Sequence, residues 1–197
     1  MTSLVSEKPA TREAGFTELV IVCCHAVYLG GSDPTDDPYQ EKTWHLQPFQ
    51  RSNADTLKVG EHETFLAHIQ AGMNSLHRPG TLLVFSGGIT THHQISEARS
   101  YLNACNSLRL RGRLRQTEAM LKGLSGIATE EYATDSYQNL LFSIIKFWQL
   151  TGSYPHSITV ITHAFKESRF LELHAQAIHW PAERIRVQGI NPPFTGN

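Results

Sequence analysis

The stretch LVIVCC, residues 19–24, is the part of the sequence that decides the fold. Its β-branched residues and unbroken apolar character are typical of a strand buried on both faces of a parallel sheet. Four further stretches are expected to add strands to that sheet: LLVF at 82–85, IATEEY at 127–132, SITVIT at 157–162 and RIRV at 184–187.

Helical patterns of apolar residues separate these strands. The expected helices are 61–76, 95–104, 136–150 and 167–178. Strands that alternate with helices predict an α/β fold, a three-layer Rossmann-like parallel sheet with helices on both faces. Because right-handed crossovers bring all strand exits to one edge, we look there for a ligand site.

The remaining segments suggest one domain with two irregular parts. We expect a flexible N-terminal segment at 1–17 and a single α/β domain at 18–197. Residues 30–60, with several glycines, prolines and acids, predict an excursion or lid. The alternating leucines and arginines within 106–124 predict an Arg-rich insertion.

Composition narrows the class of protein. The chain has 197 residues, 40% of them hydrophobic, which argues against disorder. Its 17 basic and 18 acidic residues give a formal charge of -1, so no global attraction to nucleic acid or anionic membrane is expected. Three cysteines form no disulfide framework, and the longest apolar run, 19–29, is too short to cross a bilayer. These features predict a cytoplasmic protein without a membrane segment, and they leave the oligomeric state open.

The second strand exits at Ser86-Gly87-Gly88. Glycines let backbone amides approach an anion, and a following helix adds the positive end of its dipole. A tight turn that requires positive φ is the other interpretation.

Two histidines and two glutamates also follow strands. His25 and His163 could act as acid, base or ligand, because imidazole titrates near neutrality. The simpler interpretation is that a histidine here only forms hydrogen bonds at the edge of the sheet. Alternation along the third strand sends one of Glu130 and Glu131 inward, and Glu131 is our candidate for a base or ligand contact.

Further polar residues lie at the start of the two last helices. Asp135, Ser136 and Asn139 either face a ligand or cap a helix. Lys166 and Arg169 share a face and would neutralise an anion, unless they are simply solvated.

Several kinds of site are not indicated. The adjacent pair His92-His93 is expected to diverge into solvent, so no metal site is predicted. The sequence contains neither a nucleophile elbow nor a phosphate-binding G-x-G-x-x-G or P-loop pattern.

The order of the polar motifs resembles the SanA/YdcF/ElyC-like family, a domain of unknown function, in its fungal-type branch. The resemblance covers roughly 19–190 and rests on Phe85-Ser86-Gly87-Gly88, Glu97-Ala98, Glu131 with Asp135-Ser136-Tyr137-Gln138-Asn139, and Val160-Ile161-Thr162-His163-Ala164-Phe165-Lys166-Glu167-Ser168-Arg169. It implies a Rossmann-like sheet, with S-adenosylmethionine binding in one bacterial branch and cell-envelope maintenance in others. By matching position, it implies a pocket lined or supported by Ser86, Gly87, Gly88, Glu97, Ser136, Asn139, Thr162 and Arg169.

This chain departs from the bacterial pattern at three places. Cys24-His25-Ala26 stands where that pattern has glycines, and Lys166 where it often has a histidine. Relatives commonly continue past Pro193, so one interpretation is that this chain is a shortened product.

Three functions remain open at this stage. The first is an enzyme or cofactor-dependent protein acting on a small polar or anionic, nucleotide-like molecule, with proton transfer by His25, Glu131 and His163. The second is a ligand-sensing module without catalysis. The third, which the neutral net charge disfavours, is nucleic-acid contact through Arg109–Arg115.

Overall fold

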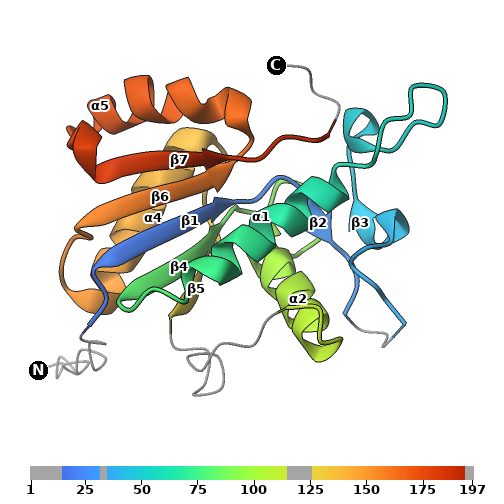
Figure 1. The fold of residues 1–197 in the computed structure, drawn as a ribbon, viewed down its shortest axis with the longest axis horizontal. Coiled ribbons are helices and arrows are strands. Elements are labelled where there is room, and N and C mark those ends of the chain that lie inside the picture. Colours follow the sequence, from blue (N-terminus) through green and yellow to red (C-terminus); the bar gives the residue numbers. More distant parts are fainter. Residues whose placement is uncertain (1–14, 32–34, 115–125, 194–197) are drawn as a thin grey trace, which may run out of the picture.

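The computed structural model describes residues 15–31, 35–114 and 126–193, and its centre is a five-stranded sheet (Figure 1). All neighbouring strands pair in parallel, in the order β5-β4-β1-β6-β7. The strands are β1 (Glu18–Cys23), β4 (Thr81–Ser86), β5 (Ile127–Glu130), β6 (Ser157–Thr162) and β7 (Ile185–Gly189). The predicted class, a Rossmann-like parallel sheet with helices on both faces, is therefore confirmed.

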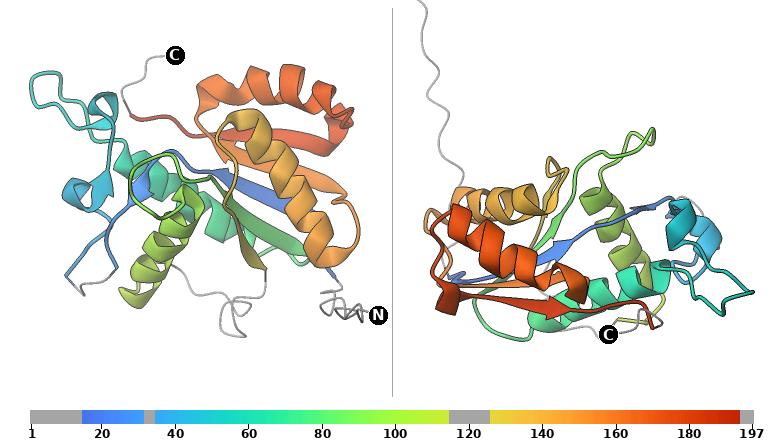
Figure 2. Two further views of the ribbon diagram at one scale, coloured as in Figure 1. Left: turned by 180° about the vertical axis from the view of Figure 1, so that it is seen from behind. Right: turned by 90° about the horizontal axis from the view of Figure 1, so that it is seen from above.

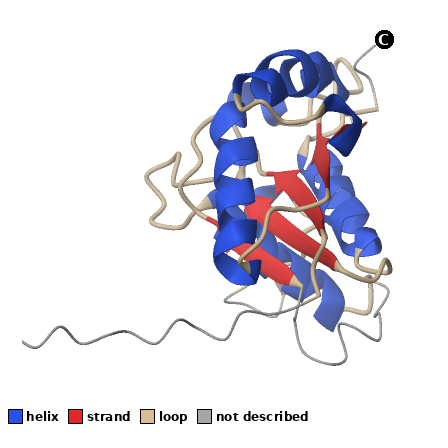
Figure 3. Cartoon of the chain, turned by 90° about the vertical axis from the view of Figure 1, so that its left-hand side faces the viewer, coloured by secondary structure: helices blue, strands red, loops and turns tan. Residues whose placement is uncertain are grey.

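Alternation along β1 divides the core into two halves. Val20 and Val22 face one side, where they pack with the helices α1 (His62–Ser75) and α2 (Glu97–Leu110). Leu19 and Ile21 face the other side, where they pack with α4 (Ser136–Thr151) and with the helical segment η4 (Arg169–His174) and α5 (Ala175–Ala177). Figure 2 shows α4 lying across the sheet from behind, and Figure 3 shows helices on both sides of the strands. The result is the three-layer arrangement.

The strand order places a switch point beside β1. From β1 the chain moves through β4 to β5 on one side, and then crosses to β6 and β7 on the other. Helices that leave β1 and β6 in opposite directions open a crevice between the carboxyl ends of these two strands. The residues that follow them, His25 and His163, are therefore well placed for a ligand site.

The predicted excursion is built around a short antiparallel hairpin. It pairs β2 (Val27–Tyr28) with β3 (Trp44–His45), and short 3-10 turns stand at Glu41–Thr43 and Pro48–Gln50. Trp44 is 5% exposed, contacts the ring of Tyr101 edge-on at 5.6 Å, and donates a hydrogen bond from Nε1 to the Pro38 carbonyl. An aromatic anchor on α2 thus holds the hairpin against the domain, at the right of Figure 1.

The expected insertion at 106–124 is partly wrong. Helix α2 continues to Leu110, because Leu108 packs into the core with a helical period that extends that of Ala104. Arg111 donates to the Asp36 carbonyl at 2.8 Å and Arg113 pairs with Asp37 at 2.9 Å, so these arginines bind the excursion. Residues 115–125 lie outside the described part of the chain, as does the expected flexible segment up to residue 14.

Two further expectations concern the described residues. All three cysteines are free and buried. None of the helices within the described ranges has the length and apolar character needed to cross a membrane.

Candidate functional site

A cavity of about 540 Å³ lies beyond the carboxyl ends of β1 and β6. Its volume falls within the range of small-molecule sites, which is roughly 300–1,000 Å³. Six of the predicted residues line it, namely His25, Glu97, Ser136, Asn139, His163 and Lys166. The strand edge therefore collects side chains from distant parts of the sequence into one crevice, as its topology predicts.

His25 is held by hydrogen bonds at both ring nitrogens. Its Nε2 lies 3.2 Å from Oγ1 of Thr162, and its Nδ1 lies 3.4 Å from Nζ of Lys166. An ammonium group can only donate, so Nδ1 accepts from Lys166 and Nε2 carries the proton that is donated to Thr162. Burial, with the nearby Lys166 and the histidines His163 and His68 as smaller causes, holds the pKa of His25 well below its usual value. His25 is thus a neutral support for Lys166 and is poorly placed to be the proton-transfer group predicted from the sequence.

His163 lines the cavity with a largely buried ring. It is 5% exposed, its Nδ1 has no hydrogen-bond partner, and its Nε2 lies 3.8 Å from a carboxylate oxygen of Glu61. Burial is the main cause that lowers the pKa of His163 to about 3, and His68 and Lys166 lower it further. At neutral pH the imidazole is uncharged and is a weak base, so it is better suited to a hydrogen bond than to proton uptake.

Lys166 supplies the positive charge of the cavity. It stands at the end of the 3-10 turn η3 (Ala164–Lys166) that follows β6. Burial and the charge of Arg169 lower its pKa, while Glu97 and Glu61 partly offset that effect. No carboxylate among the described residues lies within ion-pair distance of its ammonium group. Two of its three N–H donors are therefore left for a ligand once His25 has taken one.

The glycines after β4 do not form the predicted anion cradle. The amide of Gly87 donates to the Glu130 carbonyl at 3.0 Å, and that of Gly88 donates to the Ala133 carbonyl at 2.6 Å. Neither glycine has positive φ, so the tight-turn interpretation is also wrong. A Cβ at Gly88 would lie 2.9 Å from the Ala133 carbonyl oxygen. Close approach of two backbone segments is what requires glycine here.

Ser86 and the two glutamates at the end of β5 have structural partners. Ser86 is fully buried, and its hydroxyl lies 2.6 Å from a carboxylate oxygen of Glu130 and 2.9 Å from Oδ1 of Asn139. Glu130 is the inward member of the pair. Glu131 points away from the cavity, accepting from Ser96 at 2.8 Å and pairing with Arg99 at 2.7 Å. The prediction that Glu131 acts with His25 and His163 is therefore wrong, because alternation along β5 turns it to the other side.

The N-terminus of α4 forms another wall. Asp135 caps the helix by accepting from the amide of Gln138 at 2.8 Å, which confirms the capping interpretation for that residue. Ser136 and Asn139 nevertheless face the cavity, and the Ser136 hydroxyl also lies 2.8 Å from Nε2 of His174. The positive end of the α4 dipole is thus directed at the cavity.

The two other predicted residues lie outside the lining. Thr162 is fully buried and acts through its contact with His25. Arg169 is exposed at the start of η4. It is three residues after Lys166, but Lys166 ends a 3-10 turn and Arg169 begins a π-helix, so the two side chains do not keep the α-helical spacing that was predicted.

The sequence offered little signal for three lining residues. Gln50 comes from the excursion and donates from Nε2 to the His25 carbonyl at 3.0 Å. Glu61 stands immediately before α1, and burial raises its pKa. Phe165 stacks on His163 with ring centroids 5.3 Å apart. The excursion carries Gln50 to the cavity by a path that no periodicity in the sequence describes.

The pair His92-His93 does not diverge as predicted. The two ring centroids lie 4.1 Å apart, and the ring of His45 from β3 lies 4.8 Å from that of His93. The irregular backbone of the loop between β4 and α2 allows neighbouring side chains to turn the same way, unlike those of a strand.

Comparisons with known proteins find one curated relative that shares most of the chain. Neither a known family model nor a solved structure matches. The uncharacterized protein YOR238W of Saccharomyces cerevisiae (strain ATCC 204508 / S288c) is 32% identical over 212 aligned residues. The alignment covers 89% of this chain and 67% of the yeast protein. The chain therefore belongs to the family of this uncharacterized yeast protein.

Proposed function

We propose that the chain binds a small anionic, nucleotide-like molecule in the strand-end cavity, with Lys166 as the principal contact. The observation that carries the proposal is the state of Lys166. It lines the cavity, its ammonium is oriented by a neutral His25, and no described carboxylate pairs with it. A partly buried cation without a counterion is costly, and a bound anion would restore its pKa and stabilise the fold.

Two other walls of the cavity suit the same ligand. The N-terminus of α4 adds a positive partial charge, and the Asn139 and Ser136 side chains offer hydrogen bonds. Phe49 and Phe165 lie on the exposed side of the cavity, 69% and 65% exposed. Their rings could stack on a planar base while the anionic group reaches Lys166.

Membership in the SanA/YdcF/ElyC-like family remains part of this proposal, supported by the order of its motifs. S-adenosylmethionine, which that resemblance implies, would meet mixed charges in the lining, because Lys166 repels its sulfonium whereas Glu61, Glu97 and Asp135 add carboxyl groups to the same cavity. The glycine amides after β4, already bonded to carbonyls, offer it no donors. It is therefore included as a competing probe of the same cavity.

A thermal-shift screen tests the proposal. The probes are inorganic phosphate, adenosine mono-, di- and triphosphate, and S-adenosylmethionine. A ligand at 100 times its Kd stabilises the folded state by about 2.7 kcal/mol, which raises Tm by roughly 5–10 °C for a chain of this size. Stabilisation by at least one anionic probe is expected.

Matched lysine variants locate the binding. Lys166→Met removes a charge-assisted contact and should weaken binding about 10- to 100-fold. Lys42→Met removes an exposed lysine of the excursion and should leave binding unchanged. The proposal fails if no anionic probe binds, or if both variants bind equally well.

A second candidate is proton transfer by His163 on the same ligand. The carboxylate of Glu61, 3.8 Å from Nε2 of His163, favours it, because a nearby negative charge stabilises the protonated ring. Turnover of a bound probe that is lost in His163→Gln, with binding retained, would support an enzyme, whereas binding without turnover would support a sensor. Nucleic-acid contact has less support, because Arg111 and Arg113 are engaged with the excursion. We also expect a cytoplasmic location, where three free thiols remain reduced.

A further inference from the structure

Three histidines from two separate segments converge outside the cavity. His45 is the last residue of β3, whereas His92 and His93 belong to the loop between β4 and α2. Nε2 of His93 lies 3.2 Å from Nδ1 of His45, and one ring nitrogen from each of the three lies within 4.8 Å of the others. This convergence joins parts of the chain that are 47 and 48 residues apart in sequence.

The segments that carry these histidines are fixed by contacts of their own. β3 is paired with β2 and anchored by the buried Trp44 beside His45. The loop is held by a hydrogen bond from the His93 amide to Oγ1 of Thr91 at 3.3 Å, and by one from Thr90 to Glu97 at 2.6 Å. The rings therefore meet on a preformed framework.

The arrangement leaves donor atoms for a ligand. Nε2 of His93 and Nδ1 of His45 share one proton in a hydrogen bond, and an ion that displaces this proton would bind the same two nitrogens. Within the described residues, no hydrogen bond holds the His92 ring, which packs against the other two rings. Neutral imidazoles present the lone pairs that transition metals bind.

We propose that His45, His92 and His93 form a binding site for a divalent first-row transition-metal ion such as Zn²⁺. Two tetrahedral ligands at the usual Zn–N length of about 2.0–2.1 Å are about 3.3 Å apart, close to the spacing of His93 and His45. His92 is exposed and can complete the set by a small rotation. Among the described residues no aspartate, glutamate or cysteine joins the cluster, so water would fill the fourth position.

The ion would link the two segments that form the rim of the cavity. The segment after His45 leads to Gln50, and the loop with His92 and His93 also carries Thr90; both Gln50 and Thr90 line the cavity. A bound ion would fix their separation. The metal site is independent of the anion proposed for the cavity, since Lys166 takes no part in it.

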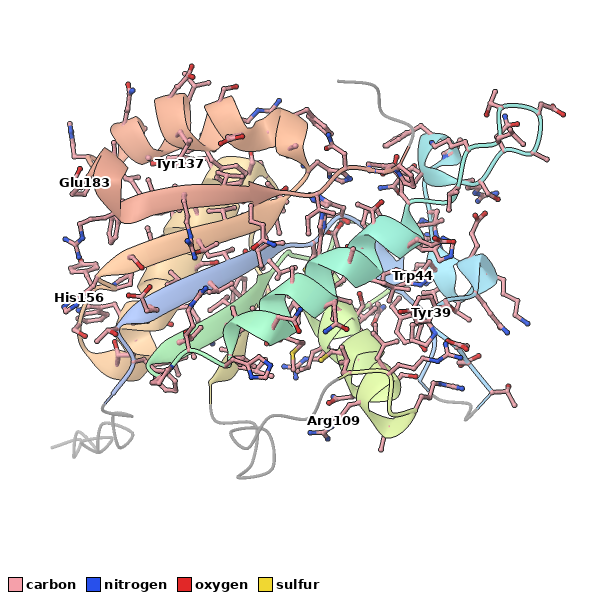
Figure 4. The ribbon with its side chains drawn as sticks, viewed as in Figure 1. Tyr39, Trp44, Arg109, Tyr137, His156 and Glu183 are labelled. Atoms are coloured by element: carbon pink, nitrogen blue, oxygen red, sulfur yellow. The ribbon has the colours of Figure 1, made fainter. Side chains whose placement is uncertain are left out.

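Calorimetric titration of ZnCl₂ into the untagged full chain tests the site, because a polyhistidine tag would itself bind the ion. Stoichiometric one-to-one binding is expected for the unmodified chain. His92→Ala and His93→Ala should each weaken it about tenfold or more, since each removes one of three ligands. His156→Ala is the matched control, because His156 is exposed at the opposite end of the molecule from Trp44 and the β2–β3 hairpin (Figure 4).

Two further measurements sharpen the result. Circular dichroism shows whether each variant is folded, and Zn²⁺ should raise the Tm of the unmodified chain but not that of His92→Ala. His163→Ala reports on the histidines of the cavity, which are the other place where the ion could bind. The proposal is overturned if the unmodified chain does not bind Zn²⁺, if the His92 and His93 variants bind it as well as His156→Ala does, or if binding is lost only in His163→Ala.

Discussion

The buried His68 should make the protein sensitive to acid. This residue of α1 is fully buried, and its Nε2 lies 3.0 Å from the Ile190 carbonyl, an acceptor that requires the proton on Nε2. Its Nδ1 has no partner. Burial lowers the pKa of His68 to about 4; Lys166 acts in the same direction, and the bond to Ile190 opposes both. The folded protein therefore excludes a proton that the unfolded chain accepts near pH 6.5.

The sign and size of the effect follow from this difference in pKa. As the pH falls through 6.5 the unfolded state takes up a proton first, so folded stability declines until the pH reaches about 4. For this one group the loss is negligible at pH 7.5 and about 2 kcal/mol at pH 5. The neighbouring His25 and His163, whose pKa values are lowered in the same direction, add to the acid sensitivity of the whole protein.

Urea unfolding at pH 7.5 and pH 5.0 isolates the contribution of His68. His68→Gln keeps a donor for the Ile190 carbonyl but cannot titrate, so its free energy of unfolding should fall by about 2 kcal/mol less than that of the unmodified chain over this range. His156→Gln replaces an exposed histidine and is the control, so its stability should depend on pH as that of the unmodified chain does. Equal pH dependence of His68→Gln and the unmodified chain would refute the reasoning.

Three other perturbations have definite outcomes. Gly88→Ala should lower the free energy of unfolding by about 1–3 kcal/mol in urea titrations, because its Cβ would press on the Ala133 carbonyl; an unchanged midpoint would contradict this. The three buried thiols should react with Ellman's reagent only after unfolding, since burial raises the pKa of Cys105 to about 12; rapid labelling of the native protein would contradict it. A double-mutant cycle of Arg113→Ala and Asp37→Ala should give a coupling of about 0.2–1 kcal/mol that declines in 1 M salt, whereas coupling insensitive to salt would exclude an exposed ion pair.

Most of the fold could be predicted from hydrophobic patterns. The strand at 157–162 and the helix from 136 were expected within a residue of their observed bounds, because unbroken apolar runs and a capped helical period are strong local signals. The helix after Ser96 extends six residues beyond its expected end. The alternating leucines and arginines there resemble an edge strand, and only the structure shows that Leu108 is buried. The helical pattern at 167–178 predicted a helix there, but no local signal shows that a 3-10 turn precedes it or that Arg169–His174 forms a π-helix.

The candidate site was predicted by topology more than by motif. His25, His163 and Lys166 share the cavity because parallel strands deliver their carboxyl ends to one edge. The roles within it depend on hydrogen bonds that sequence does not encode locally. Glu131 and the Gly87 amide looked available from sequence alone, yet one pairs with an arginine and the other with a backbone carbonyl.

The β2–β3 hairpin, inserted between β1 and α1, separates residues that select a ligand from residues that hold the sheet together. Residues on the floor of the cavity are next to residues that pair the strands, so substitutions there would also destabilise the sheet. The hairpin has its own anchor in Trp44, and it presents Phe49 and Gln50 at the opening. Duplicated genes for this fold could therefore change which ligand the cavity binds through substitutions at residues 48–60, while the strands of the sheet stay the same.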